Sequence, residues 1–405
     1  DTTDTGPEIG PNQCEQPDQP FTWYGGPEET GVDDPFGVLI ADYDGNGVDD
    51  ILFAANGGAF VRILAFGNGP PTIIDLEGVS EQPPYYGDQR IADIEIADLD
   101  GDGDQDIVVV TDQDNIGVYV YRSGPGGPAL WGSYFTIPLL SDTVRGAELG
   151  HFDDDANLDL AIITDSQAAK GRILVGGGDP SAANMGNSYF SPELSLVEIG
   201  YTDFYDSDVL AAVDGEVTDS LLVSGRNGNM PALWRIQREQ GMVLWDWAEP
   251  MSIGVSFPGR ELAVGRINGD DRDDVAVLDS DGHLQSYFST PNGFVPAMTT
   301  IGTELEVGLG TGLSGLVLHD INCDGFTDMI FNSTAPPAIQ IVLGDGNGGI
   351  ITPEVIGYTT SPGGQGLVGV VEFDNEDENY DLVHTLGGAE SEVKVYTSTE
   401  LMMMP

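Results

Sequence analysis

Short apolar stretches alternate with polar turns along the whole chain. The first unit has apolar stretches at 36–42, 50–55, 60–66 and about 72–76, with an acidic turn after the first of them. Gly and Asn residues separate the later stretches, and these residues favour tight turns between antiparallel strands. No long segment has apolar residues at helical spacing. The pattern predicts an all-β protein built from units of four short antiparallel strands.

The unit recurs seven times, and in each copy an Asp residue closes the acidic turn and starts the second strand. These closing residues lie about 55 residues apart and are Asp50, Asp106, Asp159, Asp219, Asp274, Asp328 and Asp381. A fixed period of this length is typical of solenoids and propellers. Because a four-stranded sheet that is apolar on both faces must pack between two neighbours, we expect a seven-bladed β-propeller.

The two ends of the chain carry separate predictions. The seventh unit has three clear strands, and 20–25 is the strand-like segment before the first unit. We expect 20–25 to close the ring as the missing strand; the alternative is that 399–404 completes the last blade. Residues 1–19 are rich in Thr, Pro, Gly and acids, as in the spacer that follows a removed export signal. The expected organisation is a spacer at 1–19 and one propeller domain at 20–405.

The charge balance restricts the partners. The chain has 13 basic and 68 acidic residues, a net charge of −55. Such a field repels phosphate backbones and anionic membranes, so we expect no nucleic-acid partner. No apolar run is long enough for a transmembrane segment. Cys14 and Cys323 are too few for a disulfide scaffold and either form one bridge or remain two thiols.

The acidic turns have the chemistry of a calcium loop. In the pattern Asp-x-Asp-x-Asp-Gly-x-x-Asp, oxygens at positions 1, 3, 5 and 9 converge, and the carbonyl at position 7 adds another ligand. Calcium takes about six to eight oxygen ligands. An EF-hand loop begins in the same way, but it ends in Glu at position 12 and is flanked by helices, whereas these turns enter a strand. We therefore expect calcium between the first and second strands of a blade.

Three turns have complete ligand sets, and two others are incomplete. The ligands expected in the first turn are Asp42, Asp44, Asn46, the carbonyl of Val48 and Asp50. Those in the second are Asp98, Asp100, Asp102, the carbonyl of Asp104 and Asp106. Those in the sixth are Asp320, Asn322, Asp324, the carbonyl of Phe326 and Asp328. The third turn starts with His151 but keeps Asp153, Asp155, Asn157 and Asp159, so a fourth ion is possible there. The seventh turn is lengthened and holds Asp374, Glu376, Asp377 and Asp381, for which a fifth ion and an empty turn remain alternatives.

The fourth and fifth turns break the pattern. The fourth is one residue short. The fifth carries Arg266 and Arg272 at ligand positions, and a guanidinium takes the place of a cation. We expect this fifth turn to be metal-free and ion-paired.

These turns, together with the Gly-rich turn at 342–349, resemble FG-GAP or VCBS repeats, which occur in integrin α-subunit propellers and in many secreted bacterial proteins. The resemblance covers about residues 36–397. It implies a seven-bladed propeller with structural calcium and a secreted or surface-tethered protein.

The expected function is binding or adhesion by a monomer, with a protein or glycan ligand on the face opposite the calcium loops. The insertions at 176–192 and 359–366 are the expected contact segments on that face. A lectin-like sugar site around Trp245 and Trp247 is one alternative. A polysaccharide lyase or hydrolase on a propeller frame is another, but no catalytic motif selects any residue for it.

Overall fold

The fold is given by a computed structural model. It describes residues 22–23, 36–55, 60–67, 69–76, 90–112, 115–124, 127–132, 135–138, 142–153, 155–166, 171–191, 195–199, 203–211, 218–227, 230–237, 251–253, 261–279, 283–290, 293–296, 313–321, 324–335, 337–347, 356–359, 368–371, 381–386 and 392–397.

The described strands pair into seven antiparallel sheets, and each contains four strands in the same order, to which one sheet adds a fifth. The first strands are β2 (Phe36–Ala41), β6 (Arg90–Ala97), β11 (Asp142–Gly150), β15 (Asp203–Leu210), β19 (Glu261–Gly265), β23 (Ser314–His319) and β27 (Val368–Val371). The second strands are β3 (Asp50–Ala55), β7 (Asp106–Asp112), β12 (Asp159–Ser166), β16 (Ser220–Asn227), β20 (Asp274–Leu278), β24 (Asp328–Thr334) and β28 (Asp381–Leu386). The third strands are β4 (Phe60–Gly67), β8 (Asn115–Arg122), β13 (Gly171–Gly176), β17 (Met230–Gln237), β21 (Leu284–Thr290), β25 (Pro337–Val342) and β29 (Glu392–Thr397). The fourth strands are β5 (Gly69–Asp75), β10 (Phe135–Pro138), β14 (Ser195–Ile199), β18 (Met251–Ile253), β22 (Gly293–Pro296), β26 (Ile356–Thr359) and β1 (Thr22–Trp23).

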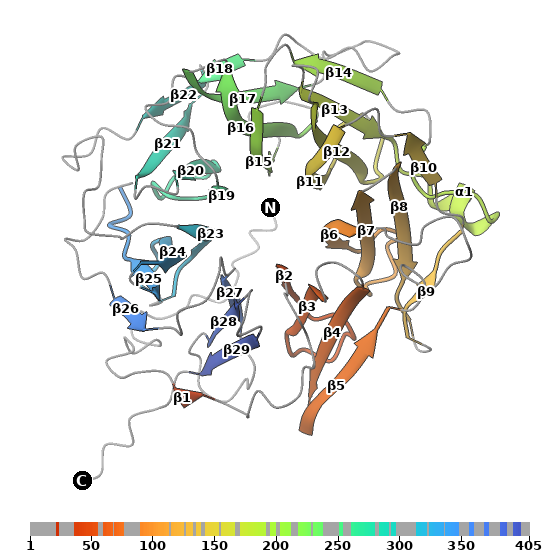
Figure 1. Cartoon of the computed structure of the whole chain (residues 1–405), viewed down its shortest axis with the longest axis horizontal. Coiled ribbons are helices and arrows are strands. Elements are labelled where there is room, and N and C mark those ends of the chain that lie inside the picture. The colour runs from red at the N-terminus through yellow and green to blue at the C-terminus, as the bar shows by residue number, and fades with distance from the viewer. Residues whose placement is uncertain are drawn as a thin grey trace, which may run out of the picture.

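The first strands form a closed circle at the centre of the molecule. Each first strand contacts the first strand of the next sheet, and β27 contacts β2 to complete the circle. Figure 1 shows the sheets radiating outwards from this circle, with the fourth strands at the rim. This radial arrangement is that of a β-propeller.

Strands from both ends of the described chain complete one sheet. β1 pairs antiparallel with β29, with Thr22 opposite Thr397 and Trp23 opposite Tyr396. The strand at the start of the chain therefore covers the outer edge of the sheet formed by β27, β28 and β29.

The hydrophobic core is divided into clusters between neighbouring sheets. Successive residues of a strand point to opposite faces, so a second strand that is apolar throughout serves two clusters. In β3, Leu52 and Ala54 pack with residues of β7, whereas Ile51 and Phe53 pack with Val383 of β28. The cluster that contains Ile51, Phe53 and Val383 spans the junction between the first sheet and the last, so apolar packing also closes the ring.

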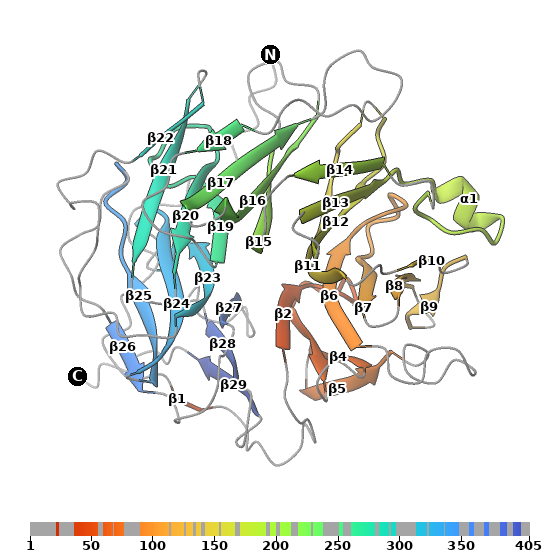
Figure 2. The same ribbon diagram turned by 45° about the horizontal axis from the view of Figure 1, so that its top comes forward.

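Two elements lie outside the four-strand pattern, β9 (Ala129–Leu130) on the second sheet and a helix from the third. β9 pairs with the end of β8. The short helix α1 (Pro180–Asn184) follows β13 and lies beside β9 and β10 (Figure 2). No helix in the described ranges is long and apolar enough to cross a membrane.

One prediction about the insertions is wrong. The segment 176–192 was expected on the face opposite the acidic turns, but it joins the third strand β13 to the fourth strand β14. Because successive strands of an antiparallel sheet run in opposite directions, this connection lies at the same end of the sheet as the turn between the first and second strands. The insertion therefore flanks the acidic turns. The second expected contact segment, 359–366, lies almost entirely outside the described residues.

Candidate metal centres

Carboxylates converge in three of the acidic loops. In each, one carboxylate oxygen from each of three Asp residues lies within 4.8 Å of the others. The groups are Asp42, Asp44 and Asp50 in the first loop, Asp98, Asp100 and Asp106 in the second, and Asp153, Asp155 and Asp159 in the third. Negative charges this close repel one another unless a cation or protons compensate them. The donor set consists of hard oxygen atoms, which suits calcium.

The backbone curls around the first carboxylate of the first and second loops. In the first loop, Asp42 accepts hydrogen bonds from the backbone N–H groups of Asn46, at 2.9 Å, and Gly47, at 2.8 Å. Gly45 and Gly47 adopt φ values of 70° and 85°, a left-handed conformation that glycine adopts at low cost. Asp98 organises the second loop in the same way, with Asp102 and Gly103 as donors.

The fifth position supports the turn in the first, second, third and sixth loops. Its side-chain oxygen accepts a hydrogen bond from the backbone N–H of the seventh position, at 2.7 to 3.0 Å. The donor–acceptor pairs are Val48 with Asn46, Asp104 with Asp102, Asn157 with Asp155, and Phe326 with Asp324. In the third loop the carbonyl of Asn157 also lies 3.2 Å from Nδ1 of His151, so the expected carbonyl ligand is engaged by the side chain at the first position.

The closing aspartates hold the loops to the sheet. In the first sheet, Asp50 accepts hydrogen bonds from the N–H groups of Tyr43, in the loop, and Phe66, in the third strand. Asp106, Asp159, Asp274 and Asp328 make the equivalent pair of contacts. Asp274 does so in the fifth loop, where no metal is expected. The repeated closing aspartate therefore has a structural role that does not depend on an ion.

Burial also changes the acidity of the closing aspartates. All five are completely buried. Burial raises the pKa to about 6 for Asp50, Asp106 and Asp274, and to about 7 for Asp159 and Asp328. Withdrawal from water penalises the charged carboxylate, and a bound cation would offset that penalty.

The remaining loops are less complete. In the sixth loop, Asp320 accepts hydrogen bonds from Asp324 and Gly325, as in the first, but its three aspartates do not approach one another as closely as those of the other groups. Asn322 and Cys323 lie outside the described residues, as do Cys14, the seventh loop at 372–380 and the pair Trp245 and Trp247.

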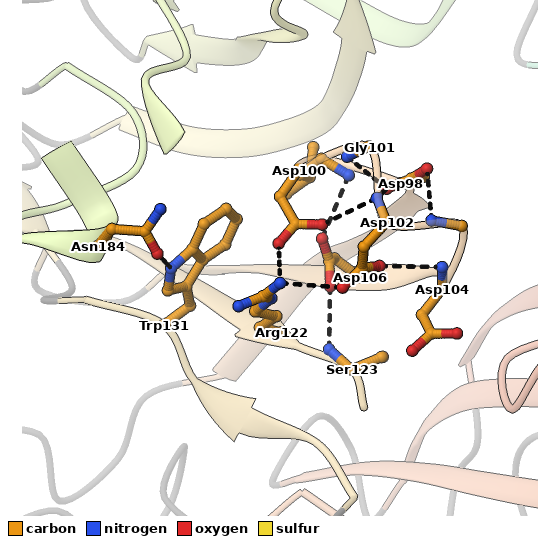
Figure 3. A network of polar contacts seen from close by, with 12 residues as sticks. Asp98, Asp100, Gly101, Asp102, Asp104, Asp106, Arg122, Ser123, Trp131 and Asn184 are labelled. Atoms are coloured by element: carbon orange, nitrogen blue, oxygen red, sulfur yellow. Dashed lines mark hydrogen bonds and ion pairs between the residues drawn. The ribbon is translucent and has the colours of Figure 1, made fainter. Parts of the chain in front are cut away.

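Arginine contacts acids in two loops, in the fifth as the sequence predicted and in the second as it did not. In the fifth loop, Nε of Arg266 is 4.0 Å from Asp273, a neighbouring acid that was not an expected ligand. In the second loop, Arg122 from the end of β8 reaches both Asp100 and Asp102 (Figure 3). No local pattern reveals this contact, because Arg122 follows the loop by about 20 residues and belongs to another strand.

A second set of carboxylates lies on the first strands. We call Asp93, Glu95, Glu148, Asp206, Asp208 and Glu261 the inner-strand carboxylates. Most accept a hydrogen bond from the neighbouring first strand. The acceptor–donor pairs are Asp93 with the N–H of Ala147, Glu148 with the hydroxyl of Ser207, Asp206 with the N–H of Leu262, Asp208 with the N–H of Val264, and Glu261 with the N–H of Gly315. These five pairs join neighbouring sheets, and the carboxylates in them were not among the residues predicted from the sequence.

Comparisons with known proteins support the fold. No family model matches the sequence, and no curated protein is significantly similar to it. The solved structure of BBS1N in complex with ARL6DN has a TM-score of 0.53 at 12% identity, over 92% of this chain and 94% of that one. Sqt1 of Saccharomyces cerevisiae has a TM-score of 0.49 at 11% identity, over 91% of this chain and 89% of that one. The Dos1 propeller has a TM-score of 0.49 at 11% identity, over 89% of this chain and 78% of that one.

Proposed function

We propose that this chain is a seven-bladed β-propeller whose acidic loops bind structural calcium and whose ring presents a protein-binding surface outside the cell. Each of the seven described sheets would be one blade. The observation that carries the calcium role is the convergence of three carboxylates in the first and third loops. In both loops, backbone N–H groups hold carboxylates in place: Asp42 accepts from two of them in the first loop, and Asp153 accepts from Asp155 in the third. Among the described contacts, no basic side chain pairs with the three acids of either group.

Calcium in these loops would act as a cross-link. Each loop joins a first strand to a second strand, and its closing aspartate also contacts the third strand, at Phe66, or the segment just after it, at Gly178. An ion held by such a loop fixes three strands of one blade relative to one another. Extracellular calcium modules bind at about 10⁻⁴–10⁻³ M, and the net charge of −55 suits a calcium-rich environment. Secretion or surface tethering is part of the proposal for these reasons.

The binding role is supported by the architecture and by charge. A propeller presents two broad faces, and the solved relative BBS1N was crystallised in complex with ARL6DN. The strongly acidic surface of this chain favours a partner with complementary positive charge, because such charge accelerates encounter. We place the partner on the face opposite the acidic loops. Catalysis is not part of the proposal.

Calcium binding is tested by counting bound ions and following thermal unfolding. Asp44→Asn removes one carboxylate from the first loop group. Asp271→Asn removes the same charge from an exposed residue of the fifth loop, which belongs to no such group. Equilibrium dialysis should show one ion fewer for Asp44→Asn and no change for Asp271→Asn. Calcium should raise the melting temperature of the wild-type protein, and a melting temperature that is unaffected by chelation would refute the structural role.

A further inference from the structure

Arg122 occupies part of the second acidic loop. Its Nη2 atom donates to Oδ2 of Asp102 at 2.9 Å and also contacts Oδ2 of Asp100. Asp100 and Asp102 are the third and fifth positions of the loop, so one guanidinium nitrogen joins two expected calcium ligands. Figure 3 shows the guanidinium between these two carboxylates and the ring of Trp131.

Among the five loops whose closing hydrogen bonds the structure describes, only the second has an arginine at this position. The residue after Arg122, Ser123, donates its N–H to the closing Asp106. In four other sheets a backbone N–H donates to the closing aspartate in the same way, and the residue before that donor is equivalent to Arg122. These equivalent residues are Ala65, Gly177, Phe288 and Leu343. None of these side chains carries charge. The second loop therefore has a built-in cation that these four positions lack, while the equivalent position in the register of the fourth sheet, Arg238, lies outside the described residues.

Neighbouring aromatic and polar residues position the guanidinium. Its carbon atom lies 5.5 Å from the centre of the Trp131 ring, within the range of a cation–π contact. The Trp131 indole N–H donates to Oδ1 of Asn184 in α1, and its ring packs against Tyr189. Trp131, which follows β9, and Asn184 in α1 of the third sheet thus contribute to the placement of Arg122.

The ion pair is only partly engaged. The Nε atom of Arg122 is buried without a hydrogen-bond partner, while Nη2 alone serves both carboxylates. By contrast, Arg62 uses Nε and Nη2 to contact the two oxygens of Asp75, the parallel geometry in which arginine binds carboxylates most strongly. The Arg122 side chain is also 41% exposed, so water screens its charge. Such a contact is displaceable.

We propose that Arg122 is a resident counter-ion of the second loop, which calcium must displace, and that this loop binds calcium more weakly than it would without the arginine. The inference rests on the calcium role proposed for these loops. In the absence of calcium, the guanidinium reduces repulsion between Asp100 and Asp102. When calcium is present, the guanidinium competes with the ion for the same oxygens and repels it.

The test uses terbium, which binds oxygen-rich calcium sites and emits light when a nearby tryptophan is excited. Trp131 is the tryptophan beside the second loop, so emission that is lost in Trp131→Phe reports on this loop. Arg122→Gln should lower the terbium concentration that gives half of this Trp131-dependent emission by about tenfold or more, which corresponds to the loss of about 1.4 kcal/mol of competition. Arg145→Gln is the matched control, because Arg145 also forms an exposed ion pair, with Asp165, away from the loop.

Stability gives a second measurement. Arg122→Gln should melt at a lower temperature than the wild type in a chelator, and it should gain more from added calcium. Equal calcium affinities in the wild type and Arg122→Gln would overturn the inference, and so would an absence of Trp131-dependent emission while other loops still bind terbium. If neither calcium nor terbium binds any variant, the proposed calcium role itself fails.

Discussion

The carboxylate of Asp93 in β6 accepts a hydrogen bond of 2.7 Å from the backbone N–H of Ala147 in β11. This contact joins the first strands of two neighbouring sheets, and Asp206 in β15 makes the same kind of contact with Leu262 in β19. A register shift immediately precedes both aspartates, between Ile91 and Asp93 in β6 and between Phe204 and Asp206 in β15. Bulges of this kind redirect a side chain. The propeller is therefore held together by polar contacts near its centre as well as by the apolar clusters.

Asp93→Ala should destabilise the protein. It leaves the buried N–H of Ala147 without its acceptor, which costs about 1–3 kcal/mol. Denaturant unfolding measures the loss. Glu95→Gln is the control, because it removes one charge from the same strand and Glu95 accepts no hydrogen bond among the described residues. If both variants lost the same stability, the hydrogen bond from Ala147 would not be the cause of the loss in Asp93→Ala.

The metal-free protein should become more stable as the pH falls from about 8 towards 5. Burial raises the pKa of Asp93 and of Asp208 to about 6, and burial together with neighbouring acids raises the pKa of Glu95 and Glu148 well above the usual range. In the unfolded chain these carboxyls titrate at about pH 4. Between these values the folded protein binds more protons than the unfolded chain, so the free energy of unfolding falls as the pH rises through about 4 to 6 and beyond.

Thermal unfolding in a chelator, measured across this pH range, checks the prediction. Glu95→Gln should raise the melting temperature at pH 8 and flatten the pH dependence, because it removes a carboxyl whose charged form is disfavoured by burial and by Asp93 and Asp208. Asp271→Asn, on an exposed loop residue, should leave the slope unchanged. A melting temperature that falls between pH 8 and 6 would contradict the expected direction.

The closing aspartates should be needed with or without calcium. Asp274→Ala removes the acceptor for the N–H groups of Asn268, in the fifth loop, and Ser289, in β21. The loss of one or both contacts should cost about 2–4 kcal/mol, and the cost should be the same in chelator and in calcium. Asp44→Asn should instead matter only when calcium is present. Parallel denaturant titrations in the two buffers separate these cases.

Removal of β1 should weaken the last sheet. A chain that lacks residues 1–24 exposes the edge of β29, which pairs with Thr22 and Trp23 in the intact protein. Its melting temperature should fall by several degrees, and it should aggregate more readily because an unpaired edge strand is exposed. A chain that lacks only residues 1–19 retains β1 and should match the full chain. Equal behaviour of the two truncated chains would show that this pairing contributes little.

The periodic aspartates made the sheet pattern predictable, because each closing aspartate starts a second strand whose apolar residues serve two clusters. The strand β15 was not predicted, since its sequence carries Asp203, Asp206 and Asp208. A first strand packs closely beside its neighbours at the centre, and there carboxylates that bond to the next strand replace apolar side chains. Apolar periodicity alone does not detect such a strand.

The candidate site was predictable only in part. Spacing within a loop placed the groups at Asp42, Asp98 and Asp153, because the ligands of one turn are neighbours in sequence. The contact of Arg122 with Asp100 depends on how a distant strand end meets the loop, and so does the position of α1 beside it. Neither relationship has a local sequence signal.

The pairing of β1 with β29 also sets an order of events during synthesis. Trp23 leaves the ribosome long before its partner Tyr396 has been translated. The earlier sheets are contiguous in sequence and can form as they emerge, since domains and their substructures fold progressively during translation. The sheet that completes the ring must wait for the last strand, and until then the nascent chain displays an open flank at Ile51 and Phe53, where Val383 will pack.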